Sequence, residues 1–257
     1  MAEAELRQAA RAIAERIGPR ATVVADTGAG MSRESGVPTF RGAEGLWEKH
    51  RAEDVATIEV LRAAPGTFWR FHDSLRQVMM DAEPNAGHRS LADMEQALGD
   101  EVEFGVITQN IDCLHQRAGS RHVVQVHGDA LSYECMACGA NVADVPYPAP
   151  SYPPTCETCG GVIRPRVVLF GEMLPEQALL EAQRLAQAAD VFLVIGTSVV
   201  VEPAASLPFI ALQSGALVVE INPIQTPLTP YAHCSVRGGA ATAIPALWAE
   251  VRGALGQ

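Results

Sequence analysis

One stretch of the sequence indicates the architecture of this chain: Ala21-Thr22-Val23-Val24-Ala25-Asp26-Thr27-Gly28-Ala29-Gly30-Met31-Ser32. Its first part, Ala21 to Ala25, is an apolar, β-branched run of the kind that forms a buried strand in a parallel sheet. The turn from Thr27 to Ser32 follows at once, and its glycines would let backbone N–H groups approach a pyrophosphate at the start of a helix. Such a turn is also common as a plain tight connection, so by itself it is a weak indication of a ligand.

Four more apolar runs predict strands that would lie beside the first. They are Phe104 to Thr108, His122 to Val126, Val191 to Ile195 and Leu217 to Ile221. Helical patterns separate these runs, and the clearest is Leu174 to Ala189, where Pro175 suits the first helical position. Strands that alternate with helices predict an α/β fold built on a doubly wound parallel sheet.

Two segments interrupt this alternation. The segment from Arg41 to about Met80 is rich in Trp and Phe and has helical spacing without a strand signal. The segment from Ala130 to about Arg166 contains two cysteine pairs and a proline-rich stretch, which cannot form regular helix or central strand. We therefore predict a single domain over 1–257, in which 1–40, 81–129 and 167–257 form the sheet, 41–80 is a helical insertion and 130–166 is a metal-binding insertion.

The composition is that of a globular protein. The chain has 257 residues, of which 48% are hydrophobic and 19% charged. Charged residues interrupt the segment from Ala2 to Arg20, so we expect an amphipathic helix there and neither a signal peptide nor a membrane span. A cytoplasmic location without membrane attachment follows as an expectation. Disulfides are rare in that compartment, and the six cysteines are expected to be metal ligands or buried thiols.

Acidic residues outnumber basic ones, 30 against 19, and the formal net charge is −11. Nucleic-acid binding needs clustered Lys and Arg, so no specific nucleic-acid partner is expected. The charge favours basic partners, or it serves solubility alone. The sequence leaves the oligomeric state open, and a monomer is among the options.

The two cysteine pairs have the spacing of a four-thiolate zinc ribbon. The pairs are Cys135 with Cys138 and Cys156 with Cys159, and seventeen residues separate them. A tetrahedral Zn²⁺ that is purely structural needs four such ligands and keeps no open position for chemistry. We therefore predict one structural zinc ion per chain. Cys113 and Cys234 belong to no such motif and are expected to be packed thiols.

Polar clusters follow several of the predicted strands. Besides the glycine turn, they are Thr108-Gln109-Asn110-Ile111-Asp112, Gly196-Thr197-Ser198 and Asn222-Pro223. Ligands of an open parallel sheet bind across the carboxyl ends of its strands, so these clusters are expected to share one crevice. His127 follows another predicted strand and would lie beside that crevice, where an imidazole could take a proton from a sugar hydroxyl.

Taken in order, these motifs resemble those of the sirtuin family. The resemblance rests on Gly28-Ala29-Gly30-Met31-Ser32, Gly36-Val37-Pro38-Thr39-Phe40-Arg41, Gly45-Leu46-Trp47, Gln109-Asn110-Ile111-Asp112, His127-Gly128, the cysteine pairs, Phe170-Gly171-Glu172, Gly196-Thr197-Ser198 and Ile221-Asn222-Pro223. Pro84-Asn85-Ala86-Gly87-His88 and Thr39 make the chain most similar to the class III branch. The resemblance covers nearly the whole chain. It implies a Rossmann-like sheet with a small inserted zinc-ribbon and helical domain, and the activity of an NAD-dependent protein-lysine deacylase.

The resemblance also implies roles for individual residues. His127 would be the catalytic base, with Asn110 beside it. NAD would contact Gly28, Ala29, Gly30, Ser32, Phe40, Arg41, Trp47, Gln109, Asn110, Ile111, Asp112, Gly196, Thr197, Ser198, Asn222, Pro223 and Ala240. A peptide with an acylated lysine would add as a short strand between 168–172 and 199–202, with contacts from His72, Val168, Phe170, Gly171, Glu172 and Val201.

In the implied reaction, NAD is consumed as a cosubstrate. The acyl oxygen attacks C1′ of the nicotinamide ribose and expels nicotinamide. His127 then takes a proton through the ribose hydroxyls, and water finally releases lysine and O-acyl-ADP-ribose.

One place departs from the relatives that remove succinyl or malonyl groups. Those relatives carry a Tyr and, three residues later, an Arg that fix the acyl carboxylate, and here the two places hold His72 and Leu75. Leucine cannot pair with a carboxylate, and Arg76 is one residue off, about 100° around a helix. We therefore expect acetyl or another neutral acyl group on the substrate, with desuccinylase or demalonylase activity as an alternative.

Other activities stay open at this point. A protein ADP-ribosyltransferase would use the same NAD site, and the sequence does not separate it from a deacylase. A zinc-ribbon module that recruits protein or nucleic acid would explain the cysteines but not the other clusters. A hydride-transferring dehydrogenase fits poorly, because Arg33 stands where the third fingerprint glycine belongs and no acidic residue ends a second strand at the expected distance.

Overall fold

A six-stranded sheet forms the centre of the protein, which the computed structural model describes over residues 3–39 and 51–256. Its strands are β1 (Thr22–Thr27), β2 (Glu103–Thr108), β3 (Val123–Gln125), β7 (Val191–Ile195), β8 (Leu217–Ile221) and β9 (Cys234–Val236). They lie in the order β3-β2-β1-β7-β8-β9, and each neighbouring pair is parallel. The strand order reverses between β1 and β7, which is where open α/β sheets bind their ligands.

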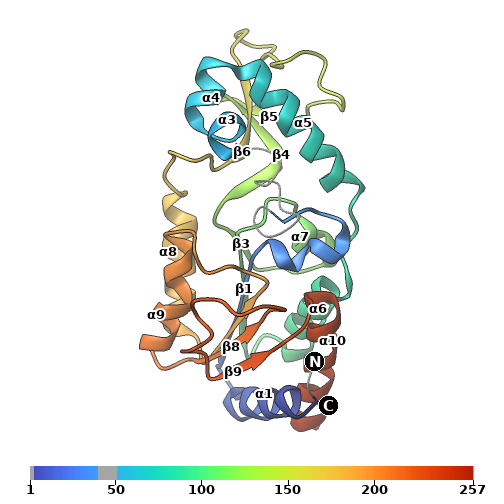
Figure 1. Ribbon diagram of the computed structural model, residues 1–257, viewed down its shortest axis with the longest axis vertical. Coiled ribbons are helices and arrows are strands. Elements are labelled where there is room, and N and C mark those ends of the chain that lie inside the picture. The colour runs from blue at the N-terminus through green and yellow to red at the C-terminus, as the bar shows by residue number, and fades with distance from the viewer. Residues whose placement is uncertain (1–2, 40–50, 257) are drawn as a thin grey trace.

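Helices cover both faces of this sheet (Figure 1). On one face lie α1 (Glu3–Arg16), α6 (Ala86–Leu98) and α10 (Ala240–Leu255), and on the other lie α8 (Glu176–Ala188) and α9 (Leu207–Gln213). Successive strand residues point to opposite faces, so Val23 and Ala25 join the first core while Val24 joins the second. Burial on both faces explains why the strands read as continuous apolar runs in the sequence.

A smaller lobe lies beyond the sheet, at the top of Figure 1. It contains the antiparallel sheet β5-β4-β6, formed by β4 (Gly128–Cys135), β5 (Asn141–Val142) and β6 (Ile163–Val167), and the helices α3 (Ala52–Val55), α4 (Ile58–Ala63) and α5 (Pro65–Asp81). Phe68, Trp69 and Tyr133 belong to its core. The indole N–H of Trp69 donates to the carbonyl of Ile163 at 2.7 Å, so this side chain joins α5 to β6.

Arg76 holds the proline-rich part of the small lobe in place. Its guanidinium is buried and donates to the hydroxyl of Tyr133 at 3.0 Å and to the carbonyls of Val145 and Pro146 at 3.0 and 2.7 Å. Asp73 lies 3.0 Å from the same guanidinium and supplies the opposite charge. Both terminal nitrogens of this buried, paired cation are hydrogen-bonded, so α5 and the loop after β5 are held as one unit.

Short elements complete the described part of the chain. They are α7 (Leu114–Ala118) and the 3₁₀ helices η1 (Ala29–Met31), η2 (Arg33–Ser35) and η3 (Ala204–Ser206). Within residues 3–39 and 51–256, no helix combines the length and the apolar character that a membrane crossing requires.

The predicted fold class is confirmed: the structure has a doubly wound parallel sheet, flanking helices and an inserted lobe. Two of the predicted strands, Val191–Ile195 and Leu217–Ile221, have the predicted bounds, and the others differ by one or two residues. Pro175 precedes α8 as its N-cap, so its prediction as the first helical residue was wrong by one position. The strand β9 was not predicted. The proposed limits of the two insertions, 41–80 and 130–166, stay predictions.

Candidate functional site

The glycine turn after β1 packs directly against the turn after β7. A Cβ atom on Gly28 would lie 2.7 Å from the Cα of Thr197, and one on Gly30 would lie 2.7 Å from the carbonyl oxygen of Gly196. Both distances are too short for any side chain, so close packing of two loops requires these glycines. The turn continues into η1 and η2, so the helix expected after it is of the 3₁₀ type.

Asn110 joins the end of β2 to this glycine turn. Its side-chain amide donates one hydrogen bond to the carbonyl of Gly28 at 3.0 Å and another to the hydroxyl of Ser32 at 3.1 Å. Both N–H groups of the amide are thereby used. The carbonyl oxygen Oδ1 is left as the atom that Asn110 can offer to a ligand.

Ile111 and Asp112 continue the same loop. Asp112 is buried, and burial raises the pKa of its carboxyl group, while hydrogen bonds from Ser32 and from the backbone N–H of Leu114 lower it. The bond from Leu114 measures 3.0 Å. Asp112 therefore anchors the start of α7, and Ile111 beside it is half-buried.

His127 stands where the sheet ends and the small lobe begins. Its ring nitrogen Nδ1 lies 3.0 Å from the carbonyl oxygen of Gln109, so Nδ1 carries the proton and Nε2 keeps a lone pair. Burial lowers the pKa of the imidazole, and the bond to Gln109 partly opposes that change. The ring is therefore neutral near pH 7 and able to accept a proton through Nε2.

Gly128 is required beside this histidine. Its φ of 77° lies in the left-handed region, and a Cβ atom there would come within 1.9 Å of the carbonyl oxygen of Arg166. The carbonyl of His127 itself accepts a hydrogen bond from the N–H of Val168 at 2.9 Å. The backbone of β6 thus fixes the direction in which the imidazole leaves the chain.

The loops after β7 and β8 meet on the opposite side of the glycine turn. Thr197 accepts a hydrogen bond from the amide of Gln109 at 3.2 Å, and its carbonyl accepts one from Asn222 at 2.9 Å. Ser198 and Pro223 are exposed beside them. Ala240 is buried at the start of α10, where the next N–H, that of Ala241, donates to the carboxylate of Glu34 at 2.7 Å.

Hydrogen bonds therefore connect the ends of five strands. One path runs from His127 through Gln109 and Thr197 to Asn222, and a second joins Asn110 to the glycine turn. Residues predicted separately from their positions after strands are thus brought together at the reversal of the strand order. Phe40, Arg41 and Trp47 lie outside the residues that the structure describes.

The predicted peptide-binding segment lies between the two lobes. The backbone of Phe170 bonds to both Ala56 and Ile58 at 3.1 Å, while its side chain is exposed. Glu172 accepts two hydrogen bonds from Arg164, at 2.6 and 2.7 Å, and these bonds hold the loop around Gly171. Val168, Glu172 and Val201 are partly buried. One edge of this segment, Val168 to Glu172, therefore has an ordered backbone that a peptide could join.

His72 occupies a different environment from the other predicted substrate residues. It is buried in the small lobe, stacked on Phe68 and edge-on to Trp69, with Nε2 lacking a partner among the described residues. Burial and then the charge of Arg76 lower the pKa of this imidazole to about 4. His72 is therefore neutral at physiological pH.

The four paired cysteines form one cluster, with ligand atoms all within 4.8 Å of one another. The sulfur of Cys135 lies 3.5 Å from that of Cys159, and the sulfur of Cys138 lies 4.0 Å from that of Cys156. A tetrahedral ion with Zn–S bonds of about 2.3 Å would hold its ligands about 3.8 Å apart, so the spacing suits zinc. Gly161 supports the same reading, because a Cβ there would lie 3.0 Å from the sulfur of Cys135.

A second group of possible ligands, Glu103, His122 and Glu181, lies at the other end of the sheet. Arg184 bridges its two carboxylates, with contacts of 2.5 Å to Glu103 and 2.8 Å to Glu181. A guanidinium already supplies the positive charge there, so we interpret this group as an ion-pair brace between β2 and α8.

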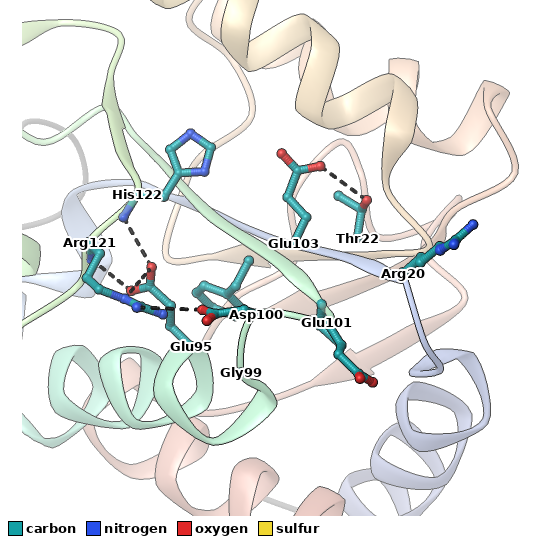
Figure 2. A pocket seen from close by; sticks show the side chains of 11 residues that line it. Arg20, Thr22, Glu95, Gly99, Asp100, Glu101, Glu103, Arg121 and His122 are labelled. Carbon is teal, nitrogen blue, oxygen red and sulfur yellow. Dashed lines mark hydrogen bonds and ion pairs between the residues drawn. The ribbon is translucent and has the colours of Figure 1, made fainter.

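A surface hollow of about 670 Å³ lies beside this brace and is shown in Figure 2. Thr22, Glu103 and His122 on its wall stand at or just before the starts of three strands. The hollow is therefore at the amino ends of the strands, whereas the linked loops lie at the carboxyl ends, where α/β sheets place their ligands. We assign it no part in the site.

Sequence reasoning missed residues that hold the glycine turn from behind. The side-chain amide of Asn85 donates to the carbonyl of Met31 at 2.8 Å and to the hydroxyl of Ser35 at 3.0 Å. His88, one turn later on α6, lies 3.4 Å from the hydroxyl of Ser32. The run from Pro84 to His88 signals only that Asn85 caps α6, because an Asn before an apolar helix commonly does so, and carries no signal for the contact with the glycine turn.

The sequence matches the model of the Sir2 family over residues 28–203. A protein of Aquifex aeolicus (strain VF5) named NAD-dependent protein deacylase is 46% identical over 230 residues, which are 90% of this chain and 95% of that protein. A solved Sir2 homolog–NAD complex is similar with a TM-score of 0.85 and 41% identity, over 99% of this chain and 95% of the other. The structure of Sir2Af2 bound to a myristoylated histone peptide is similar with a TM-score of 0.76 and 34% identity, over 98% of each chain. By sequence and by fold, this chain belongs to the Sir2 family.

Proposed function

We propose that this protein is an NAD-dependent protein-lysine deacylase that removes acetyl or other neutral acyl groups. The observation that supports it best is the position of His127, whose Nδ1 is bonded to Gln109 in the loop that also meets the glycine turn and Thr197. The named activity of the Aquifex protein, and the NAD and acyl-peptide complexes of similar structures, point the same way.

The NAD site would be formed by the loops after β1, β2, β7 and β8. NAD supplies the ribose carbon C1′, from which nicotinamide leaves and to which the acyl oxygen bonds. Asn110 can offer Oδ1 as an acceptor, because both of its N–H groups are held by Gly28 and Ser32. The residues predicted to complete the site are Ala29, Gly30, Ile111, Asp112, Gly196, Ser198, Pro223 and Ala240, with Phe40, Arg41 and Trp47 outside the described ranges.

His127 would act as the base. The carbonyl of Gln109 keeps the proton on Nδ1, so Nε2 is free to accept a proton from a ribose hydroxyl. The same carbonyl would then stabilise the positive charge on the ring. Burial lowers the pKa of the imidazole, which keeps the ring ready as a base near pH 7.

The preference for neutral acyl groups is supported by the state of Arg76. This cation lies next in sequence to the Leu75 position, but it is buried and committed to Asp73, Tyr133 and two carbonyls. Leu75 itself is buried and uncharged. A carboxylate on the acyl chain would therefore enter without an ion-pair partner from this part of α5, and desolvating it there would be costly.

The zinc ion would be structural, held by Cys135, Cys138, Cys156 and Cys159. This cluster lies at the opposite end of β4 from His127. Four thiolates close the coordination shell, so the ion would hold β4 and β6 together and leave the chemistry to the other site. The expectations of a cytoplasmic location, of substrates with an acylated lysine and of no specific nucleic-acid partner rest on the sequence and on the family.

The experiment incubates purified protein with NAD and matched peptides that carry acetyl, butyryl, myristoyl or succinyl lysine, and identifies the products by mass spectrometry. The wild type should form deacylated peptide, nicotinamide and O-acyl-ADP-ribose, fastest with a neutral acyl group. His127→Ala should lower kcat by roughly a thousandfold, the usual loss when an essential base is removed. His122→Ala is the matched control, because this histidine lies before the same strand but at the opposite end of the sheet.

Two results would contradict the proposal. Transfer of ADP-ribose onto protein without any need for an acyl group would favour a protein ADP-ribosyltransferase. Faster turnover of the succinyl peptide would keep the deacylase and overturn the acyl preference.

A further inference from the structure

Five carboxylate side chains are buried in the described part of the chain, and four of them have hydrogen-bond donors. Asp73 bonds to Tyr152 at 2.7 Å, Glu95 to the N–H of Arg121 at 2.8 Å, Asp112 to the N–H of Leu114 at 3.0 Å, and Glu220 to Thr229 at 2.7 Å. Asp26 is different: it is 0% exposed, and within residues 3–39 and 51–256 neither of its oxygens accepts a hydrogen bond of full geometry, although the amide of Gln109 is near enough to lower its pKa. A buried carboxyl group without a donor is costly, so its presence calls for a physical reason.

Asp26 lies in β1, beside the point where the strand order reverses. Its neighbours across the sheet are Ile107 in β2 and Val194 in β7, and both belong to the apolar core under α8 and α9. Burial raises the pKa of Asp26 to about 7. No other charged side chain contributes to this shift, so nothing in the described structure pairs with the carboxylate as an ion.

The side chain of Gln109 is the hydrogen-bond donor beside Asp26. It follows Ile107 by two residues along β2 and its continuation, so its side chain leaves the sheet on the same face as Asp26. Its amide Nε2 donates one hydrogen bond to Thr197 at 3.2 Å, and an amide carries a second N–H. The Gln109 amide is also the group that lowers the pKa of Asp26, as a neighbouring donor does.

We propose that Asp26 is a positioning residue, which fixes the side-chain amide of Gln109 so that its carbonyl oxygen faces the NAD site. One N–H of the amide would bond to Thr197 and the other would point at Asp26. Oε1 would then be presented to the ligand, as an acceptor for a hydroxyl of the ribose next to nicotinamide. When Asp26 is ionised, the reverse orientation would set Oε1 against its carboxylate oxygens, where acceptors repel each other.

This inference rests on the proposed function, and it makes a prediction about ligand class. Only a ligand that carries the second ribose, such as NAD or ADP-ribose, would depend on Asp26. ADP lacks that ribose and should not depend on it. Asp26→Leu should therefore raise KM for NAD and Kd for ADP-ribose by about five- to tenfold, the effect of losing one oriented hydrogen bond, and leave Kd for ADP unchanged.

The same variant should be more stable than the wild type, because an apolar side chain replaces an unpaired carboxyl in an apolar core. A gain in stability together with weaker ADP-ribose binding separates positioning from structural damage. Asp26→Asn keeps an acceptor oxygen and should bind ADP-ribose within about twofold of the wild type. Val24→Ala is the matched control: it lies two residues earlier on the same face, and it should lower stability without changing ADP-ribose affinity.

A double-mutant cycle tests whether Asp26 acts through Gln109. On a Gln109→Ala background, Asp26→Leu should cause no further loss of ADP-ribose affinity, measured by calorimetry. Equal ADP-ribose binding by Asp26→Leu and wild type, or equal weakening of ADP and ADP-ribose, would overturn the proposal. If the wild type fails to deacylate any peptide, the proposed function falls, while the calorimetric comparison still decides the role of Asp26.

Discussion

The activity of the enzyme should depend on the protonation state of His127. The pKa of its imidazole lies below the ordinary 6.5, with burial as the larger cause and the bond to Gln109 as the opposing one. A protonated ring cannot serve as a base, so activity should fall as the pH drops through this lowered pKa. We therefore expect the acid limb of kcat/KM against pH to have its midpoint below 6.5, measured with an acetyl peptide at saturating NAD.

The titration of Asp26 near pH 7 could also appear in that profile, so the measurement should be repeated with Asp26→Asn. A midpoint below 6.5 in both proteins assigns the limb to the histidine. A midpoint above 6.5 in the asparagine variant would contradict this assignment.

The raised pKa of Asp26 also predicts how the free energy of unfolding depends on pH. The pKa of its carboxyl is about 7 in the folded chain and 3.8 when unperturbed, so the folded state holds the proton more tightly. Stability from this group is full below the unperturbed pKa and is lost as the pH rises through 7. Relative to Asp26→Leu, the wild type should lose up to about 4 kcal/mol between these limits. Urea unfolding of both proteins at about pH 5 and pH 8 measures the part of this loss that falls above pH 5, about 3 kcal/mol; a difference that does not grow with pH would contradict the shift.

At this scale, sequence reasoning found the residues whose position alone indicates a role. Asn110, Thr197 and Asn222 follow predicted strands, and the topology of a parallel sheet brings such residues together. It could not find Asp26 or Asn85. The role of Asp26 depends on which face of β1 it occupies beside Gln109, and the role of Asn85 depends on contact with a turn fifty residues away.

Among the elements, the zinc ribbon is the one whose folding depends on a ligand. Its four sulfurs come from the end of β4, the turn after it and the turn before β6, and metal binding there would supply folding free energy. Cys135→Ala should lower the midpoint temperature of unfolding by roughly 10 °C or more. Elemental analysis should find one zinc ion per chain in the wild type and none in the variant. Cys113→Ala removes a thiol outside the cluster and is the control. A cysteine variant with an unchanged midpoint would show that the small lobe needs no metal.

The backbone of β4 sets a second test, at Gly128. Alanine there would have to adopt a φ near 77° and would meet the carbonyl of Arg166, so the start of the strand must move and carry His127 with it. We expect Gly128→Ala to cost more than about 3 kcal/mol of stability and to lose most activity. Gly215→Ala is the control: its φ is 90°, but nothing lies within 4 Å, so it should cost only about 1 to 2 kcal/mol and keep activity. Equal costs at the two positions would mean that the predicted clash is relieved.

The elements differ in how far their sequences reveal them. β7 and β8 were predicted to the residue because both faces of each are buried and, apart from Glu220 in β8, the runs are apolar. β9 has only three residues, Cys234–Val236, at the edge of the sheet, and neither length nor composition marks it. In the small lobe, α3, α4 and α5 were predicted only as helical character over 41–80, and α3 and α4, with four and six residues, are too short to show an amphipathic pattern of their own.

The molecule as a whole places its candidate reactive groups between two lobes of different construction. The large lobe is a parallel sheet with a helix-covered core on each face, and the small lobe has one core, formed by α5, an antiparallel sheet and the cysteine cluster. His127 stands at the point where β3 of the first sheet leads into β4 of the second. A change in the relative position of these sheets would therefore move the imidazole against the glycine turn, which explains why so many hydrogen bonds tie Gln109 and Asn110 to the neighbouring loops.

The net charge of the whole chain predicts how it selects peptides. With a charge of −11, the surface potential attracts basic segments toward any opening and repels acidic ones, over distances set by the ionic strength. Because a peptide that adds as a strand is held by backbone bonds, flanking charge should act mainly on KM and little on kcat. We expect an acetyl-lysine peptide with Lys and Arg neighbours to have a KM about five- to tenfold below that of a matched peptide with Asp and Glu neighbours at low salt. The gap should close as salt rises from about 0.05 to 0.5 M, because the Debye length shrinks. If the two KM values differ equally at both salt concentrations, specific contacts and not the overall field select the peptide, and the acidic surface serves solubility alone.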